Sequence, residues 1–292
     1  MNKRIYDAVI GLIVGDAFGV PYEFKPRYTF TVNPEMTGYG TYNQPKGTWS
    51  DDSSMTLATI AAFYDGDENL YASNVADYFL KWLYDAYFTP FQETFDVGGR
   101  TKLALNYYAE NGSFLFDNDI MSNGNGSLMR ILPVAFAKNY SDTLIDEISS
   151  ITHPHEISLS CCRIYAHLIR YILENPGCTK VDLIARLNYD NFKENNIINI
   201  ERVLFGTIDD ILSDGYVVNS LEAALWSFFN RGSYQASIIT AVSLGYDTDT
   251  IAAITGGIAG LYYGYDNIPE QWINDTANLD YVRYIIKTAT KI

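Results

Sequence analysis

Two short segments, far apart in the sequence, each place two carboxylates beside hydroxyl groups at the start of an apolar run. The first run covers residues 56–64 and the second covers residues 251–263. Ser, Thr and Asp are also the residues that helix N-termini prefer, because their side-chain oxygens accept hydrogen bonds from unpaired backbone N–H groups. A cap needs only one such oxygen, so the excess at both segments favours chemistry. The residues concerned are Ser50, Asp51, Asp52, Asp247, Asp249 and Thr250.

If the two segments face each other, they form a cluster of oxygen ligands. Four carboxylates at close range repel one another strongly unless a cation lies among them. Ligand sets made only of oxygen select hard cations, so the expected ion is Mg²⁺, Mn²⁺ or Ca²⁺. Zinc is disfavoured, because neither Cys nor His accompanies the segments. Composition and spacing do not show that the two segments meet in space.

Two glycine-rich segments, Asp96–Thr101 and Asn123–Ser127, each precede a predicted helix. Small residues at a helix start expose backbone N–H groups that can bind phosphate oxygens, assisted by the helix dipole. A lone glycine-rich turn is usually only a turn, so phosphate binding and a plain turn both stand as explanations.

The three histidines and one arginine have structural as well as functional explanations. His153 either orients a ligand or satisfies a buried hydrogen bond, and the sequence favours neither. His155 and His167 are expected to be structural. Arg130 is expected to form a structural ion pair one turn into the helix that follows Ser127.

Most of the chain carries the periodicity of helices. Apolar residues spaced by three and four positions form one stripe over residues 75–86 and another over residues 157–172. Residues 179–182 and 219–222 each place a capping side chain three positions before a carboxylate. Alternating strand patterns are scarce and short, as at residues 28–32. These patterns predict an all-α, many-helix protein.

Neither an internal repeat nor a low-complexity linker divides the chain, so we expect a single domain over residues 1–292. Long loops are predicted at residues 33–47 and 116–126, and loops of that length in a compact domain are usually functional. Glycines at close-packing positions predict tight helix–helix contacts without chemistry of their own. They are Gly15, Gly19, Gly256, Gly257 and Gly260.

The composition excludes several classes of protein. The 292 residues include 20 basic and 35 acidic side chains, giving a formal net charge of −15. Such a charge repels phosphate backbones, which argues against general nucleic-acid binding and against docking on anionic membranes. The 24 Tyr, 15 Phe and 4 Trp are too many large side chains for a disordered chain.

The cysteines and apolar runs predict a cytoplasmic protein. Three cysteines without metal-binding spacing indicate buried thiols in a reducing compartment (Cys161, Cys162 and Cys178). The apolar stretch 8–15 imitates a signal peptide only faintly, because aspartates flank it and no cleavage site follows. The longest uncharged apolar run, residues 250–265, is 16 residues long and falls short of a membrane span.

Five motifs in one order resemble those of the ADP-ribosylglycohydrolase family, which includes dinitrogenase reductase-activating glycohydrolase and the ADP-ribosyl-acceptor hydrolases. The resemblance extends from about residue 5 to residue 265 and is specific because five motifs share one order. The motifs are Gly15-Asp16-Ala-Phe-Gly19-Val-Pro-Tyr-Glu23, Trp49-Ser50-Asp51-Asp52-Ser53-Ser54-Met55, Asn123-Gly-Asn-Gly-Ser-Leu-Met-Arg130, Thr152-His153 and Asp247-Thr248-Asp249-Thr250.

The resemblance implies a compact, orthogonally packed all-α domain with two Mg²⁺ ions at the base of a cleft, and Mn²⁺ as a possible substitute. It implies that the six acidic and hydroxyl residues of the two segments are the metal ligands. Glu23 is implied to lie on a mobile loop over the cleft, and Asp16 to support the ligands from behind. The diphosphate and ribose contacts are implied at the glycine-rich segments and nearby, with substrate-binding residues Gly98, Gly99, Asn125, Gly126, Ser127, His153 and Tyr246.

Two departures from the family pattern bear on the site. Ser50 and Ser53 stand where Thr is usual, and the retained hydroxyl preserves the ligand oxygen. Tyr246 stands where Gly is common, and its bulk puts substrate preference in doubt more than metal binding.

The implied activity is Mg²⁺-dependent hydrolysis of the bond between ADP-ribose and a modified acceptor, such as a protein arginine or a small conjugate, by a monomer. Such hydrolysis needs an oriented sugar, a positioned water and help for the leaving group. Asp52 or Asp51 is expected to guide the water, with Glu23 as a lid residue or alternative base. The alternatives are a non-catalytic ADP-ribose-binding or crystallin-like structural protein, and a two-metal phosphatase or nucleotide hydrolase.

Overall fold

The predicted apolar stripes form helices in the computed structural model, which describes residues 3–116 and 119–290. Residues 75–85 of the first stripe lie in α3 and the second stripe lies in α6. The described residues contain no strand, and residues 28–32 form none. Two isolated bridges, Tyr39–Gln44 and Gly124–Tyr216, are the β-type pairings among them. The all-α prediction is therefore confirmed.

The α-helices of the described chain are α1 (Lys3–Gly19), α2 (Asp51–Asp65), α3 (Ala72–Asp85), α4 (Gly99–Asn111), α5 (Asp142–Ser150), α6 (Glu156–Glu174), α7 (Lys180–Lys193), α8 (Ile200–Phe205), α9 (Val217–Phe229), α10 (Tyr234–Ser243), α11 (Thr248–Tyr263), α12 (Glu270–Asp275) and α13 (Leu279–Thr290). Short 3₁₀ helices connect them: η1 (Val20–Tyr22), η2 (Gly40–Tyr42), η3 (Ile120–Ser122), η4 (Leu128–Arg130), η5 (Leu132–Phe136), η6 (Ile208–Asp210) and η7 (Tyr265–Asn267). The predicted loop at residues 116–126 includes residues 117–118, which lie outside the described chain.

One of the two predicted capping sites is confirmed. Thr179 and Asp182 form a reciprocal capping box at the start of α7. The prediction for residues 219–222 is wrong, because α9 already begins at Val217. Inside that helix, Asn219 donates to Asp214 and Glu222 accepts from Arg202 at 2.7 Å, so neither side chain is available for a cap.

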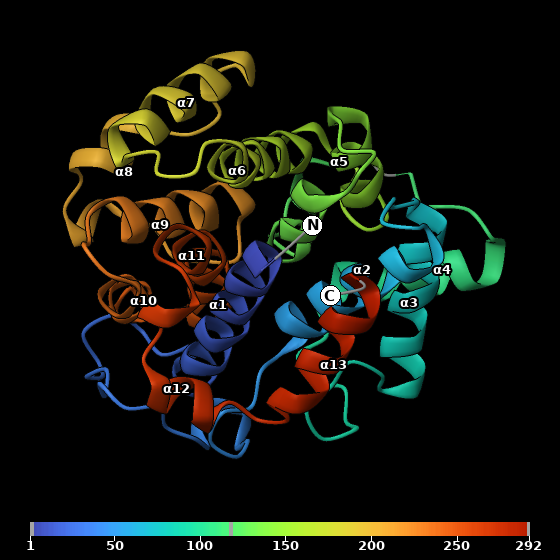
Figure 1. Ribbon diagram of the computed structural model, residues 1–292, viewed down its shortest axis with the longest axis horizontal. Coiled ribbons are helices and arrows are strands. Elements are labelled where there is room, and N and C mark those ends of the chain that lie inside the picture. Colours follow the sequence, from blue (N-terminus) through green and yellow to red (C-terminus); the bar gives the residue numbers. More distant parts are fainter. Residues whose placement is uncertain (1–2, 117–118, 291–292) are drawn as a thin grey trace.

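The helix α1 crosses the middle of the molecule, with α9, α10 and α11 on one side and α2, α3 and α13 on the other (Figure 1). Its segment Arg4–Tyr22 is long and apolar enough to span a membrane, but 94% of the tested window is buried inside the protein. That burial is typical of a core helix. One hydrophobic core cluster includes residues from Ile5 to Ala289.

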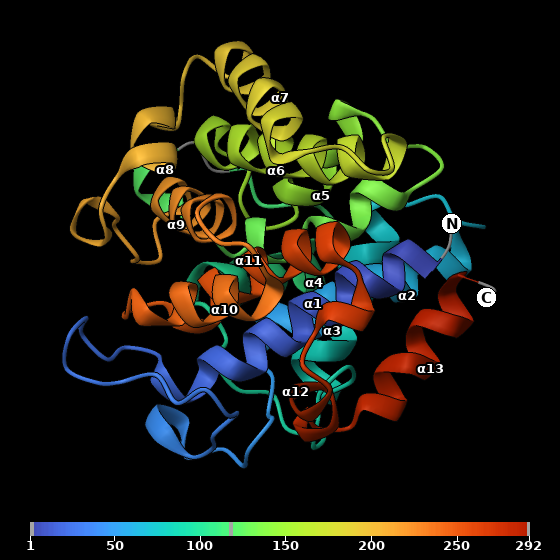
Figure 2. The same ribbon diagram turned by 60° about the vertical axis from the view of Figure 1, so that its left-hand side comes forward.

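Glycines bring α1 and α11 into backbone contact, and both views show the two helices side by side (Figure 2). A Cβ atom added to Gly11 would lie 2.4 Å from the carbonyl oxygen of Gly256, and one added to Gly15 would lie 2.2 Å from that of Ala252. At the end of α1, a Cβ on Gly19 would meet the oxygen of Thr248 at 2.5 Å. The end of α1 therefore lies against the start of α11.

The other predicted packing glycines also make close contacts. A Cβ on Gly260 would lie 2.5 Å from the carbonyl oxygen of Asp7. Gly257 packs against different neighbours, because a Cβ atom added there would meet Leu132 and the hydroxyl of Tyr165. The expectation of tight helix contacts at these glycines is confirmed.

Gly15→Ala is expected to destabilise the protein by about 1–3 kcal/mol, because overpacking forces backbone shifts between α1 and α11. Urea denaturation measures this loss. The matched control is Gly232→Ala, where an added Cβ has nothing within 4 Å. Equal stability of the two variants would contradict backbone contact between these helices.

Candidate active site

The starts of α2 and α11 meet, although the sequence alone does not show it. The Oγ1 atom of Thr250 donates to the Oδ2 atom of Asp52 at 3.3 Å, across 198 residues of chain. Asp16, at the end of α1, holds the start of α2 by accepting the backbone N–H groups of Ser50 at 3.0 Å and Ser53 at 3.1 Å. The same end of α1 packs on α11 through Gly19. One helix terminus thus positions both acidic segments.

The start of α2 places two buried carboxylates at a helix N-terminus. Ser50 is the N-cap, and its hydroxyl accepts from the backbone N–H of Asp52 at 3.3 Å. Asp51 and Asp52 occupy the first turn and are 7% and 1% exposed. Burial, followed by neighbouring carboxylates, raises the pKa of both groups well above the usual value. Asp16 behaves similarly, and burial raises its pKa to about 6.

The start of α11 contributes the second pair of carboxylates. Asp247 is the N-cap residue, and its Oδ2 atom accepts from the side-chain amide of Asn125 at 2.7 Å. Asp249 is buried, and its Oδ1 atom accepts from the backbone N–H of Thr250 at 2.9 Å. Burial is the main cause of the raised pKa of both carboxylates.

Glu23 lies within this cluster. One carboxylate oxygen from each of Glu23, Asp247 and Asp249 lies within 4.8 Å of the others, a grouping that could hold a metal ion. Burial, then repulsion from Asp96 and Asp247, raises the pKa of Glu23 to about 9. The resemblance implies a loop position over the cleft, as a lid residue or alternative base, and in the structure Glu23 is 5% exposed and lies beside the predicted ligands.

Asp96 is a site residue that the sequence analysis missed. Its Oδ1 atom accepts from the hydroxyl of Tyr42 at 2.5 Å. Its charge lies close enough to raise the pKa of Glu23, and burial raises its own pKa. The sequence feature that could have identified Asp96 is its position two residues before Gly98, at the start of the glycine-rich segment Asp96–Thr101.

The acidic cluster fits a divalent cation by its donor atoms and by its unpaired oxygens. Three buried carboxylate oxygens of this cluster have no hydrogen-bond partner among the described residues: Oε2 of Glu23, Oδ1 of Asp52 and Oδ2 of Asp249. Burying unpaired charges is costly unless they are neutralised or coordinate a metal. An all-oxygen set of this kind suits a hard cation.

A cleft of about 230 Å³ is lined both by these carboxylates and by residues of different chemistry. The acidic members of the lining are Glu23, Asp51, Asp96 and Asp247. The other members include Gly98, Gly99, Arg100, Thr101, Asn125, Gly126 and His153. Gly98 is the N-cap of α4, so the lining includes a helix N-terminus. The structure therefore brings most of the predicted substrate-binding residues to the predicted ligands.

Two predicted substrate-binding residues lie elsewhere. Ser127 is fully buried, and its hydroxyl lies 3.5 Å from the sulfur of Cys162, so it points into the core. Tyr246 is 47% exposed and lies outside the cleft lining. Its backbone N–H and carbonyl instead pair with Lys25 at 2.9 Å and Phe24 at 2.6 Å, which anchors the segment after Glu23.

The second glycine-rich segment does not start an α-helix. Residues 123–127 lead into η4, a 3₁₀ helix of three residues. The backbone N–H of Asn125 is already bonded to the oxygen of Gly215 at 3.0 Å. The prediction of a helix N-terminus at this segment is therefore wrong, and its contribution to the cleft is side chains and exposed glycine faces.

Arg130 forms no ion pair within the described residues, which corrects the sequence expectation. It is fully buried, donates to the carbonyl oxygen of Ile148 at 3.2 Å and to the hydroxyl of Thr152 at 2.8 Å, and stacks on the ring of Phe79. Burial lowers its pKa to about 9, so the guanidinium stays charged at neutral pH.

The three histidines have different surroundings. Burial, with Arg130 and Arg100 adding to it, lowers the pKa of His153 to about 3, so this ring is neutral. His155 caps α6 by accepting from the backbone N–H of Ile157 at 3.3 Å. His167 lies between Asp142 and Asp190 and ties α6 to α5 and α7. The structural expectation for these last two is confirmed.

Gly126→Ala is expected to weaken binding of ADP-ribose, the ligand that the sequence resemblance implies, roughly tenfold, because the new Cβ would lie 2.9 Å from Cε1 of His153 and 3.2 Å from Oγ1 of Thr101. The ring must shift to accommodate it. Calorimetric titration with ADP-ribose measures the change, with Gly232→Ala as the unhindered control. Wild-type affinity in Gly126→Ala would show that the position of His153 does not matter.

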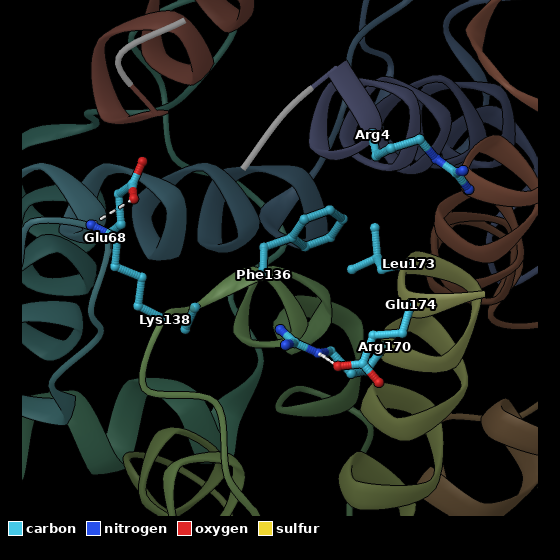
Figure 3. Close-up of a pocket in the computed structure, with 8 residues that line it drawn as sticks. Arg4, Glu68, Phe136, Lys138, Arg170, Leu173 and Glu174 are labelled. Carbon is cyan, nitrogen blue, oxygen red and sulfur yellow. Dashed lines mark hydrogen bonds and ion pairs between the residues drawn. The ribbon is translucent and has the colours of Figure 1, made fainter. Parts of the chain in front are cut away.

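Another hollow, of about 390 Å³, lies between the start of α1, η5 and the end of α6 (Figure 3). Its three cations have partners: Lys138 pairs with Glu68 at 2.8 Å and Arg170 with Glu174 at 2.6 Å. The third, Arg4, lies 3.9 Å from the carboxylate of Asp7. Because these charges are already neutralised, this hollow offers a weaker case for ligand chemistry than the cleft.

The chain is similar to known proteins over most of its length. Residues 1–291 match the family model described as ADP-ribosylglycohydrolase. The chain is 31% identical over 283 residues to the ADP-ribosylarginine hydrolase Tri1 of Serratia proteamaculans, covering 91% of this chain and 73% of that protein. It is 24% identical over 282 residues to the ADP-ribosyl-[dinitrogen reductase] glycohydrolase of Rhodospirillum rubrum, covering 94% and 90% of the two chains.

A solved structure shares the fold. It is described as an ADP-ribosylglycohydrolase-related protein complex, and it superposes with a TM-score of 0.82 at 29% sequence identity. The match covers 99% of this chain and 97% of that one.

Proposed function

The chain belongs to the ADP-ribosylglycohydrolase family, and we propose that it is a Mg²⁺-dependent enzyme. In this proposal it releases ADP-ribose from modified side chains of proteins, and the acceptor is arginine. The single observation that carries this proposal is the mixed lining of one cleft. Its carboxylates suit cations, and its glycines, the helix N-terminus at Gly98 and the guanidinium group of Arg100 suit a diphosphate. The arginine acceptor is supported by the relatives named above, whose substrates are ADP-ribosylarginine and ADP-ribosylated dinitrogen reductase.

The cluster would hold two Mg²⁺ ions, with Mn²⁺ as a substitute. The proposed ligands are those of the two helix starts, joined by Glu23 because of its unpaired buried oxygen. Bound there, the cations would neutralise the carboxylates and act as Lewis acids toward the hydroxyl groups of the ribose that carries the acceptor. The proposed set is Glu23, Ser50, Asp51, Asp52, Asp247, Asp249 and Thr250.

Among the chain's own groups, Asp51 is the best placed to orient the attacking water. Asp51 lines the cleft, whereas Asp52 does not. The Oδ2 atom of Asp52 also accepts hydrogen bonds from Ser50 at 3.2 Å and Thr250 at 3.3 Å, which fixes its orientation. We therefore assign Asp52 to holding the two helix starts together and Asp51 to the water. Gly98, Gly99 and His153, which line the same cleft, would orient the diphosphate.

The test is a panel of ADP-ribosylated arginine, serine and nucleic-acid ends, assayed with and without added Mg²⁺. Release of free ADP-ribose and intact arginine, only with the cation, supports the proposal. AMP or phosphate as product would instead identify a two-metal phosphatase or nucleotide hydrolase. Tight ADP-ribose binding without turnover of any conjugate would identify a binding or structural protein.

The proposal includes a monomer in the cytoplasm. All three cysteines are free and two of them are buried, which is consistent with a reducing compartment. Light scattering coupled to size-exclusion chromatography measures the oligomeric state, and a mass near twice 32.9 kDa would contradict a monomer.

A further inference from the structure

Three buried side chains form a hydrogen-bonded row that ends at the lining of the cleft. The Nη2 atom of Arg130 lies 2.8 Å from Oγ1 of Thr152, and that oxygen lies 2.7 Å from Nδ1 of His153. Arg130 and Thr152 are fully buried, and His153 is 2% exposed. Only His153 lines the cleft.

The chemistry of Arg130 and Thr152 decides which atom donates and which accepts in each hydrogen bond of the row. A guanidinium can only donate, so Oγ1 of Thr152 must accept from Arg130. The hydroxyl of Thr152 can still donate its own hydrogen, and its other hydrogen-bond partner in the described chain is Nδ1 of His153. If Nδ1 carried a proton instead, the buried hydroxyl hydrogen would have no acceptor, which is costly. Nδ1 is therefore the acceptor, and the proton of the neutral ring lies on Nε2.

The Nε2 edge of the ring points to the ligand side. Cβ atoms built on Gly124 and on Gly126 would each lie 3.5 Å from Nε2. Both glycines line the cleft, and neither has a side chain that would cover the ring nitrogen. The Nε2–H group of His153 is therefore available to donate a hydrogen bond to a ligand in the cleft.

We infer that Arg130 and Thr152 are positioning residues that fix the Nε2–H tautomer of His153, so that a neutral histidine donates a hydrogen bond to an anionic oxygen of the ligand. The identity of that oxygen, a diphosphate oxygen of ADP-ribose, rests on the proposed function. The tautomer itself rests only on the geometry of the three side chains. The backbone supports this arrangement, because the N–H of His153 donates to the oxygen of Ser149 at 2.9 Å.

Nitrogen-15 NMR of the histidine rings tests the tautomer directly, and the presence of only three histidines simplifies assignment. The sample is the Mg²⁺-loaded protein without nucleotide, with His153 assigned by comparison with His153→Ala. The expected result is a neutral ring protonated at Nε2, whose Nε2 resonance shifts when ADP-ribose is added. A ring protonated at Nδ1, or an Nε2 resonance unchanged at saturating ADP-ribose, would overturn the inference.

A double-mutant cycle tests whether Thr152 acts through His153. Thr152→Val removes the hydroxyl but leaves the backbone oxygen that Arg100 uses at 2.9 Å. It is expected to weaken ADP-ribose binding roughly tenfold in the wild-type background and to have little further effect in His153→Ala. Thr152→Ser, which keeps the hydroxyl, is expected to restore both the affinity and the Nε2–H signal. Equal losses in the two backgrounds would mean that Thr152 has only a structural role.

Failure of the proposed function can be told apart from failure of this inference. One outcome is that no conjugate releases ADP-ribose, while the ring is protonated at Nε2 and its resonance responds to ADP-ribose. The proposed activity is then wrong, and the inference about the tautomer of His153 is supported. If conjugates are hydrolysed but the ring carries its proton on Nδ1, the inference is wrong and the activity stands.

Discussion

Asp51→Ala is expected to lower the rate of ADP-ribose release at least about a thousandfold, because loss of a group that stabilises or positions reacting atoms costs about 4 kcal/mol. The same substitution is expected to make the metal-free protein more stable. Asp51 is buried, and the carboxylates of Asp96, Asp52, Asp16 and Glu23 all disfavour its charge. Within the described residues no side chain donates a hydrogen bond to it, so its removal relieves repulsion without breaking a side-chain hydrogen bond.

The sign of the pH dependence follows from the raised pKa of Asp51. A carboxyl group whose pKa is raised on folding stabilises the protein below its unfolded pKa, near 3.8, and this contribution is lost as the pH rises through the folded value. The stability advantage of metal-free Asp51→Ala should therefore grow as the pH rises from 4 to 8. Thermal melts in chelator should show an increase of roughly 3 °C per kcal/mol of relieved repulsion.

The control for Asp51→Ala is Asp280→Ala, which removes one negative charge from an exposed position on α13. This control should leave both activity and the pH dependence of melting unchanged. Retained activity in Asp51→Ala would contradict the role assigned to Asp51. Lower stability of that variant at pH 8 without metal would contradict a cluster of mutually repelling carboxylates.

The sequence located both acidic helix starts because capping is local chemistry. Ser50 caps α2, and Asp247 occupies the N-cap position of α11, as the residue types at those positions predict. Their convergence depends on long-range packing, in which Gly15 and Gly19 let the end of α1 approach α11 while Asp16 binds the start of α2. That arrangement joins positions more than 200 residues apart, and periodicity carries no information about it.

The residues that the sequence misassigned depend on side-chain direction. Ser127 follows the cleft glycines in the chain but points into the core toward Cys162. Arg130 pairs with a carbonyl and a hydroxyl where a carboxylate was expected. Asp96 lines the cleft beside the acidic cluster and accepts a hydrogen bond from the hydroxyl of Tyr42, which lies in η2. Each of these outcomes is decided by which neighbour the tertiary fold supplies.

Chelation of divalent cations is expected to reduce ADP-ribose release at least about a thousandfold, and added Mg²⁺ should restore it, because a bound metal supplies several kcal/mol of charge stabilisation. Binding of Mg²⁺ should also release protons. The raised pKa of about 9 means that Glu23 holds a proton at pH 7 in the metal-free cluster, and a ligand carboxylate must give up its proton. The affinity for Mg²⁺ should therefore increase from pH 6 to pH 9.

Calorimetric titration of metal-free protein with Mg²⁺, in buffers of different ionisation enthalpy, counts the released protons. Glu23→Gln keeps the shape of the side chain but has no proton to release, so it should release about one proton fewer than the wild type at pH 7. The matched control is Glu174→Gln, which alters an exposed carboxylate paired with Arg170 on α6 and should release as many protons as the wild type. Two results would contradict cation binding by these carboxylates. They are full activity in excess chelator, and Mg²⁺ binding without proton release in the wild type.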